Sequence, residues 1–359
     1  MGNVKKFIYH SQPTISKKDV DSVTKLLKTL HLEDGSNVIE IENRMKTVYN
    51  KKYAIAVNTG FASIHLSLIG YNIKEGDEVI IPTYSCPALL NPILIQKAKP
   101  VLIDTQKNGF NISFKDLKSK INKHTKLIIL PYMFGFPTNI KKILDLNIPV
   151  IEDVTLSLGG KYKNRLLGTF SDTMICSFYA TKMITGGDGG MLLTNDKKVY
   201  EIAKNYRYYG HQKQHKYLAY NYHTTNLPMS LALSQFNQLN DFISKRKKLA
   251  NLYDKLLKEI SEINIEFKNK KESVFYRYLI RLKTKEEREQ LKQYLKENGI
   301  GTGYGVLEGL HELIDTDYKY PNATKHLNTI LSLPIYPNLK KREVKYIVSV
   351  IRKFYKGKK

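Results

Sequence analysis

The sequence predicts an α/β protein: a large domain built on a mostly parallel sheet, followed by a smaller α+β domain. Apolar runs alternate with helical stretches through the first half of the chain, which is the βαβ rhythm of a parallel sheet. After about residue 240 the pattern changes to a long charged helix followed by strands and helices. At 359 residues the chain exceeds the size at which one hydrophobic core stops growing. We therefore expect a large domain over residues 1–240 and a small domain over 241–359.

The large domain is expected to begin with two helices, because residues 19–30 and 37–50 repeat apolar side chains at helical spacing. Strands with intervening helices follow. The carboxyl ends of parallel strands usually carry the functional site, so Asp104, Pro131 and Asp153 are placed where a site would form. The expected strands are Glu78–Tyr84, Lys99–Thr105, Lys126–Gly135 and Asn147–Thr155, with two more on either side of the segment Ser177–Gly190.

The small domain is expected to start from a helix over residues 231–259, which contains no Pro or Gly to mark the boundary. A strand within 275–284 and a helix over 285–299 follow it. The lysine-rich end, 340–359, has the spacing of an amphipathic helix.

Composition excludes several classes of protein. The formal charge of +25 invites a nucleic-acid interpretation, but acidic residues interleave with the lysines, as on solvated helix faces. We therefore expect no nucleic-acid partner. The two cysteines, Cys86 and Cys176, are too few for a disulfide framework or a zinc site. No apolar run is long enough for a membrane span, so a cytoplasmic protein without a bound metal is expected.

One segment, Ser177–Gly190, places Lys182 between a β-type run and a glycine-rich turn. A lysine beside phosphate, aromatic rings and a cationic cofactor loses its proton more easily than a solvated lysine. Such a lysine can form a Schiff base with pyridoxal 5′-phosphate (PLP). A surface position is the alternative, because the chain is rich in lysine.

Other residues could hold the remaining parts of PLP. Asp153 could keep the pyridine nitrogen protonated, and the segment 58–63 opens a helix whose free N–H groups favour a phosphate. Ser177 could add a hydroxyl to that phosphate site. Each residue also has an ordinary alternative, such as a helix cap, a turn or a buried hydroxyl, so the prediction depends on their order and spacing together.

Motifs along nearly the whole chain resemble the DegT/StrS-type sugar aminotransferases, which are PLP enzymes of fold type I. The Lys182 segment and its spacing from Asp153 are the specific part. The matching segments are LEDGSNVIEIE, AVNTGFASIHLSL, KEGDEVIIPTYSCPALLNPI, KPVLIDT, VIEDVT, SFYATKMITGGDGGMLLTND, TTNLPMSLALSQFNQL and LSLPIYPNL.

The resemblance implies a role for each site residue. Lys182 would be the Schiff-base lysine and proton carrier, and Asp153 the partner of the pyridine nitrogen. Ser177 and the turn Gly60-Phe61-Ala62 would hold the phosphate. Asn226 matches a residue that reaches the phosphate from the neighbouring subunit, so the resemblance also implies a homodimer whose sites lie at the interface.

Four positions depart from the family pattern. Leu156 stands where Gln or His contacts the cofactor ring, and Cys86 where an aromatic residue stacks on it. Phe61 replaces a small hydroxyl residue of the phosphate turn, and Pro228 replaces an Arg near Asn226. These departures concern the tuning of the cofactor and the substrate, whereas a lysine at position 182 excludes the family's dehydratase branch.

The expected activity is a PLP-dependent transfer of an amino group, from glutamate by family resemblance, to a nucleotide-linked keto-sugar in amino-sugar biosynthesis. Tyr84, His223 and Tyr304, the last in the loop Gly299–Val306, are candidate walls of the substrate cleft, with ordinary loop residues as the alternative. An acceptor such as a cyclitol or an unlinked amino sugar is a second possibility. A non-catalytic regulatory or nucleic-acid-binding protein that has kept the fold is a third.

Overall fold

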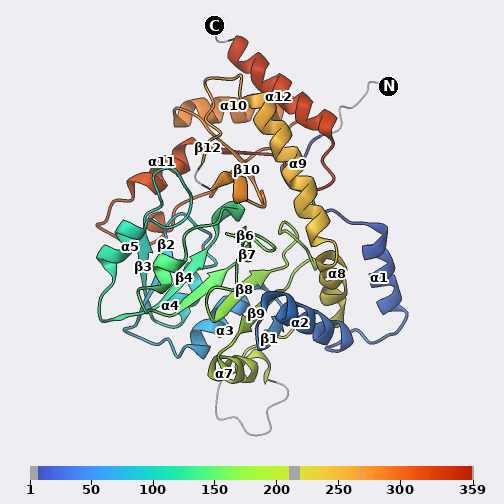
Figure 1. The fold of residues 1–359 in the computed structure, drawn as a ribbon, viewed down its shortest axis with the longest axis vertical. Helices are drawn as coiled ribbons and strands as arrows, with labels where there is room; N and C mark the ends of the chain where they lie inside the picture. Colours follow the sequence, from blue (N-terminus) through green and yellow to red (C-terminus); the bar gives the residue numbers. More distant parts are fainter. Residues whose placement is uncertain (1–6, 210–218, 268, 358–359) are drawn as a thin grey trace.

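The computed structural model describes residues 7–209, 219–267 and 269–357 (Figure 1). A central sheet occupies the large part of the molecule, and a smaller group of strands and helices lies at the end where the chain terminates (Figure 1). Within the described residues, no helix has both the length and the apolar character needed to cross a membrane.

The central sheet has seven strands in the order β1-β9-β8-β5-β4-β2-β3. The neighbours β2/β3, β2/β4, β4/β5 and β5/β8 are parallel, whereas β9 runs antiparallel to both β8 and β1. The predicted mostly parallel sheet is confirmed. Its strands are β1 (Tyr53–Val57), β2 (Glu78–Pro82), β3 (Lys99–Ile103), β4 (Thr125–Pro131), β5 (Val150–Asp153), β8 (Thr173–Ser177) and β9 (Gly190–Thr194).

Burial explains why these segments became strands. All residues of β2, β5, β8 and β9 are buried, as expected for a sheet whose two faces are both covered. The covering and connecting elements include the hairpin β6 (Lys161–Tyr162) with β7 (Arg165–Leu166). The helices are α2 (Ser36–Tyr49), α3 (Gly60–Gly70), α4 (Leu90–Ile95), α5 (Phe114–Lys120), α6 (Lys141–Leu144) and α7 (Lys197–Arg207).

The helix predicted over 231–259 is wrong in its extent, because the chain forms two helices there, α8 (Asn226–Phe236) and α9 (Leu239–Leu257). Near the break, Gln235 and Gln238 both donate to the buried carboxylate of Asp19. Asp19 belongs to α1 (Lys17–Leu27), against which α8 packs. This contact holds α8 on the N-terminal helices while α9 turns away toward the C-terminal part (Figure 1).

The C-terminal part is α+β, as predicted. Its antiparallel sheet has the order β10-β12-β11, formed by β10 (Tyr278–Arg281), β12 (Ile330–Leu333) and β11 (Gly303–Tyr304). The amphipathic end is α12 (Lys341–Lys356), which buries one apolar face including Val344, Ile347 and Ile351. The remaining helices are α10 (Lys285–Glu297) and α11 (Pro321–Thr329).

Two hydrophobic cores are present, and the chain crosses between them more than once. The first half of α9 contributes Leu239 and Phe242 to the core of the large sheet, and its second half contributes Tyr253 to the other core. Leu310 returns to the large core, while Ile8, paired with Ile300, belongs to the small one. The division at residue 240 stays a prediction, because the two cores share segments.

A buried carboxylate, Glu152, fixes the end of β5. It accepts hydrogen bonds from the hydroxyl of Tyr132 at 2.6 Å and from the backbone N–H groups of Gly168, Phe170 and Ser171 at 2.7 to 2.8 Å. Glu152 therefore ties the loop after β7 to the strand that ends in Asp153.

We expect Glu152→Ala to lower the free energy of unfolding by about 3–5 kcal/mol, because several buried donors would lose their acceptor together. The midpoint of urea unfolding measures the loss. Glu259→Ala is the control: its side chain is 74% exposed and pairs only at the surface with Arg352, where such pairs contribute about 0–1 kcal/mol. Equal midpoints for the two variants would contradict the structural role of Glu152.

Candidate active site

A cavity of about 500 Å³ lies at the carboxyl ends of β4, β5 and β8. The terminal residues of these strands, Pro131, Asp153 and Ser177, all line it. The loop 85–89 and the start of α3 close one side, and the segment 304–308 from the small sheet closes another. The parallel sheet thus places the site where the sequence predicts it.

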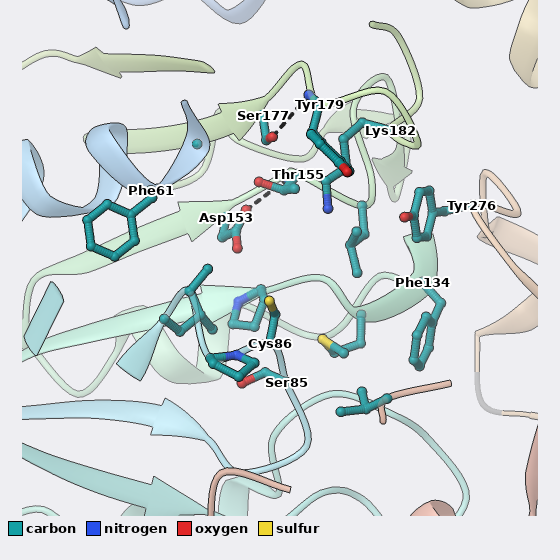
Figure 2. Close-up of a pocket in the computed structure, with 18 of the residues that line it drawn as sticks. Phe61, Ser85, Cys86, Phe134, Asp153, Thr155, Ser177, Tyr179, Lys182 and Tyr276 are labelled. Atoms are coloured by element: carbon teal, nitrogen blue, oxygen red, sulfur yellow. Dashed lines mark hydrogen bonds between the residues drawn. The ribbon is translucent and has the colours of Figure 1, made fainter. Parts of the chain in front are cut away.

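Most of the predicted site residues meet in this cavity. Phe61, Cys86, Asp153, Ser177 and Lys182 are labelled in Figure 2, which shows them around a common space. Gly60, Leu156 and Tyr304 also line the cavity, whereas Ala62 is buried one residue further along α3.

The start of α3 is suited to an anion. Thr59 caps the helix, and its Oγ1 accepts the N–H of Ala62 at 3.0 Å. The first two N–H groups, those of Gly60 and Phe61, have no acceptor within the helix itself. A side chain at position 60 would meet Ser177, because a Cβ there would lie 2.6 Å from the Cβ of Ser177. Glycine therefore lets the helix start approach the Ser177 hydroxyl, and the two together fit a phosphate.

Asp153 offers a carboxylate that is only 7% exposed. Burial raises its pKa, and the hydrogen bonds from Thr155 and the charge of Lys182 offset part of that shift. The N–H of Thr155 donates to Oδ1 at 2.8 Å (Figure 2). A cationic partner such as a protonated pyridine nitrogen would stabilise the ionised form of this buried carboxylate.

Lys182 extends into the cavity from the loop between β8 and β9 (Figure 2). Its Nζ lies 5.8 Å from the centroid of the Tyr276 ring, and Lys182 forms no ion pair with the residues that the structure describes. The glycine-rich turn is needed here, because Gly187 and Gly189 have φ angles of +87° and +125°, which side chains disfavour.

These groups fit PLP part by part. The α3 start and Ser177 would hold the phosphate, Asp153 the ring nitrogen, and Lys182 the aldehyde carbon. Cys86 and Leu156 line the same cavity. They make the part of the cavity beside the cofactor ring more apolar than the aromatic residue and the Gln or His that are usual at these positions.

Besides Ala62, three predicted residues do not line the cavity. Tyr84 was expected to form a wall but is fully buried, with its ring packed edge-on against Phe134 and its hydroxyl under Gly305. His223 packs against Tyr208, with ring centroids 4.0 Å apart and ring planes tilted by 44°. The side chain of Asn226 is bonded within its own chain, accepting from the N–H of Asn37 and donating to the carbonyl of His31.

Among the cavity residues that were not foreseen are Tyr276 and Arg277. They directly precede β10, and nothing in the local sequence distinguishes them from the edge of an ordinary strand. Packing of the small sheet against the large one is what brings them opposite Lys182.

Comparisons with known proteins agree with this geometry. A family model described as the DegT/DnrJ/EryC1/StrS aminotransferase family matches residues 13–352. A GDP-perosamine synthase of Escherichia coli O157:H7 is 33% identical, and the match covers 98% of this chain and 100% of that protein.

Solved structures show the same fold. PseC of Helicobacter pylori, an aminotransferase involved in the biosynthesis of pseudoaminic acid, superposes with a TM-score of 0.90 at 23% identity, covering 98% of this chain and all of PseC. The PLP-form of Spr1654 from Streptococcus pneumoniae gives 0.89 at 23% identity, covering 97% of this chain and 99% of that one. The predicted PLP fold of type I is confirmed.

Lys182→Ala is expected to abolish amino transfer, since Lys182 is the lysine that the described residues place in the cavity. Borohydride reduction of the PLP-loaded protein, followed by peptide mass spectrometry, should find the pyridoxyl group on the Lys182 peptide of the wild type and of Lys198→Ala. Lys198 is exposed on α7 and serves as the control. Equal pyridoxyl labelling of Lys182→Ala would refute the assignment.

Proposed function

From the premise that the chain belongs to the DegT/DnrJ/EryC1/StrS aminotransferase family and is a PLP-dependent sugar aminotransferase, we propose that it transfers the amino group of glutamate to a nucleotide-linked keto-sugar. The observation that carries the proposal is the meeting of Lys182, Asp153 and the α3 start in one cavity. Membership of this enzyme family sets aside the non-catalytic alternative.

In the proposed reaction, each group of cavity residues has a separate role. Bound PLP supplies an aldehyde that carries the amino group and a ring that accepts electrons. The amine of Lys182 would move a proton from the substrate carbon to the cofactor carbon in the first half-reaction, and in the opposite direction in the second. Asp153 stabilises positive charge at the ring nitrogen, and the α3 start with Ser177 fixes the phosphate.

The nature of the acceptor is supported by the relative and by the shape of the site. The relative from E. coli is called a GDP-perosamine synthase, which points to an acceptor linked to a nucleoside diphosphate. Walls from both parts of the chain, the loop 85–89 and the segment 304–308, border the cavity and could hold a sugar larger than a simple keto acid.

A homodimer with shared sites is part of the proposal. Apolar side chains are exposed on α1, on α2 and between them, and α1 and α2 both pack on α8, which begins at Asn226. Exposed apolar side chains gathered on neighbouring segments favour association, and a second copy seated on these helices would cover the surroundings of Asn226. The exposed side chains are Ile15, Val20, Leu27, Leu30, Leu32 and Ile39.

The acceptor can be tested in the second half-reaction alone. Protein loaded with pyridoxamine phosphate should return to the aldehyde form at least roughly tenfold faster with a nucleoside-diphosphate keto-hexose than with pyruvate, because remote contacts to the nucleotide are used in the transition state. Absorbance of the cofactor follows the return. If the nucleotide sugars are inert while an unlinked ketone such as a keto-cyclitol reacts, the cyclitol alternative replaces this acceptor.

The shared site can be tested with heterodimers purified by two tags. Asn226→Asp keeps the size of the side chain and the acceptor for Asn37, loses the donor to the His31 carbonyl, and adds a negative charge that a phosphate would repel. A heterodimer of Lys182→Ala and Asn226→Asp chains should show about half the activity of a wild-type dimer, since one of its two sites is intact. If Asn226 acts within its own chain, the heterodimer will be as inactive as its parents.

A further inference from the structure

Arg277 lines the same cavity as Lys182 but has no part in holding the cofactor. Its guanidinium carbon lies 4.6 Å from the centroid of the Tyr276 ring, a cation–π contact, and its Nη2 donates to the Tyr276 hydroxyl at 3.3 Å. The Nζ of Lys182 lies 5.8 Å from the centroid of the same ring. Tyr276 thus holds the guanidinium in place close to the reacting lysine.

The guanidinium of Arg277 uses only part of its capacity to donate hydrogen bonds. Its Nη1 is buried and has no hydrogen-bond partner, and Arg277 forms no ion pair with the residues that the structure describes. Asp188 and Glu308 line the cavity as well, but neither is paired with Arg277. Arg277 as a whole is half-buried, and its buried, unpartnered nitrogen would be stabilised by a ligand that brings an acceptor of opposite charge.

The pKa values of residues near Arg277 also reflect an excess of positive charge in this region. Burial and the charge of Arg277 lower the pKa of His10 to about 3, and the same two causes lower the pKa of Arg246 to about 10. Burial acts to raise the pKa of Tyr276, yet its pKa is lowered overall, because the charges of Arg277 and Lys182, a hydrogen bond from Thr181 and the charge of Arg246 stabilise the phenolate. An anion entering this part of the cavity would therefore be stabilised.

We propose that Arg277 is an anion-binding residue of the substrate site and that it pairs with a carboxylate of the amino donor. The planar guanidinium matches a carboxylate with two parallel hydrogen bonds, which a lysine cannot offer. The inference rests on the proposed amino transfer from glutamate, but not on the identity of the sugar.

The diphosphate of the acceptor is the competing anion, and the position of Arg277 favours the donor. A donor amino acid has a carboxylate on its reacting carbon, whereas the sugar ring separates the diphosphate of a nucleotide sugar from the reacting carbonyl. Arg277 and Lys182 share one aromatic ring, so an anion close to the reacting carbon fits best. Arg277 would then select donors by charge near the lysine that moves their proton.

The experiment measures binding without turnover. Glutarate and butyrate are titrated calorimetrically into the PLP-loaded wild type, Arg277→Gln, Arg277→Lys and the control Arg342→Gln, whose side chain is exposed on α12. We expect Arg277→Gln to weaken glutarate binding roughly ten- to hundredfold, the range for hydrogen bonds between charged groups. Arg277→Lys should recover part of the affinity, and Arg342→Gln should bind glutarate like the wild type. Cofactor content and urea unfolding midpoints identify any variant that is merely misfolded.

Separate half-reactions identify the source of the anion. Transfer from glutamate should fall with Arg277→Gln, while return of the aldehyde form by the keto-sugar should change little. Unchanged glutarate affinity, or a loss confined to the keto-sugar half-reaction, would overturn the donor assignment. If the wild type accepts amino groups from glutamate but no nucleotide sugar reacts, the proposed acceptor fails while the role of Arg277 is still decided by the glutarate titration.

Discussion

The alternation of side chains along β5 is the constraint on which the site depends. Neighbouring residues of a strand point to opposite faces, so Glu152 and Asp153 cannot share an environment. Glu152 is fixed by Tyr132 and by the backbone of residues 168–171, while Asp153 opens into the cavity. Because β5 lies between β4 and β8, pairing Asp153 with Pro131 and Ile175, the depth of the Asp153 carboxylate is set by the core and not by a loop.

The other two cofactor contacts depend on one close approach between chain segments. Thr59, which caps α3, forms a bridge with Gly189 from the turn that follows Lys182. A side chain on Gly190 would come within 2.6 Å of the Thr59 carbonyl, and one on Gly60 equally close to Ser177. Glycines on both sides therefore let the start of α3 approach the loop that carries Lys182. In the proposed site, this close approach sets the position of the cofactor phosphate relative to the reacting amine.

The sequence predicted most reliably the strands and those site residues that stand at or near the end of a strand. The strands of the parallel sheet, Asp153 and Lys182 could be predicted because periodicity and motif spacing are local properties. Tyr84 could not be placed, since alternation alone does not tell whether a side chain after a strand faces the cavity or packs on Phe134. The break before Leu239 depends on Asp19, about two hundred residues away. Arg277 was missed for a similar reason, because only the packing of the two sheets brings it opposite Lys182.

Charge illustrates the difference between composition and structure. The net charge of +25 suggests a diffuse attraction for anions, yet many of the lysines lie on exposed helices, where pairs such as Lys197–Glu201 and Lys245–Asp241 partly cancel them. Exposed charges are screened beyond about 8 Å at physiological salt. Lys182 and Arg277 are different, because they share the Tyr276 ring at the edge of a cavity and neither forms an ion pair with a described residue. In the proposed site, selection of an anionic donor belongs to Arg277, and the diffuse positive charge at most affects how quickly a substrate arrives.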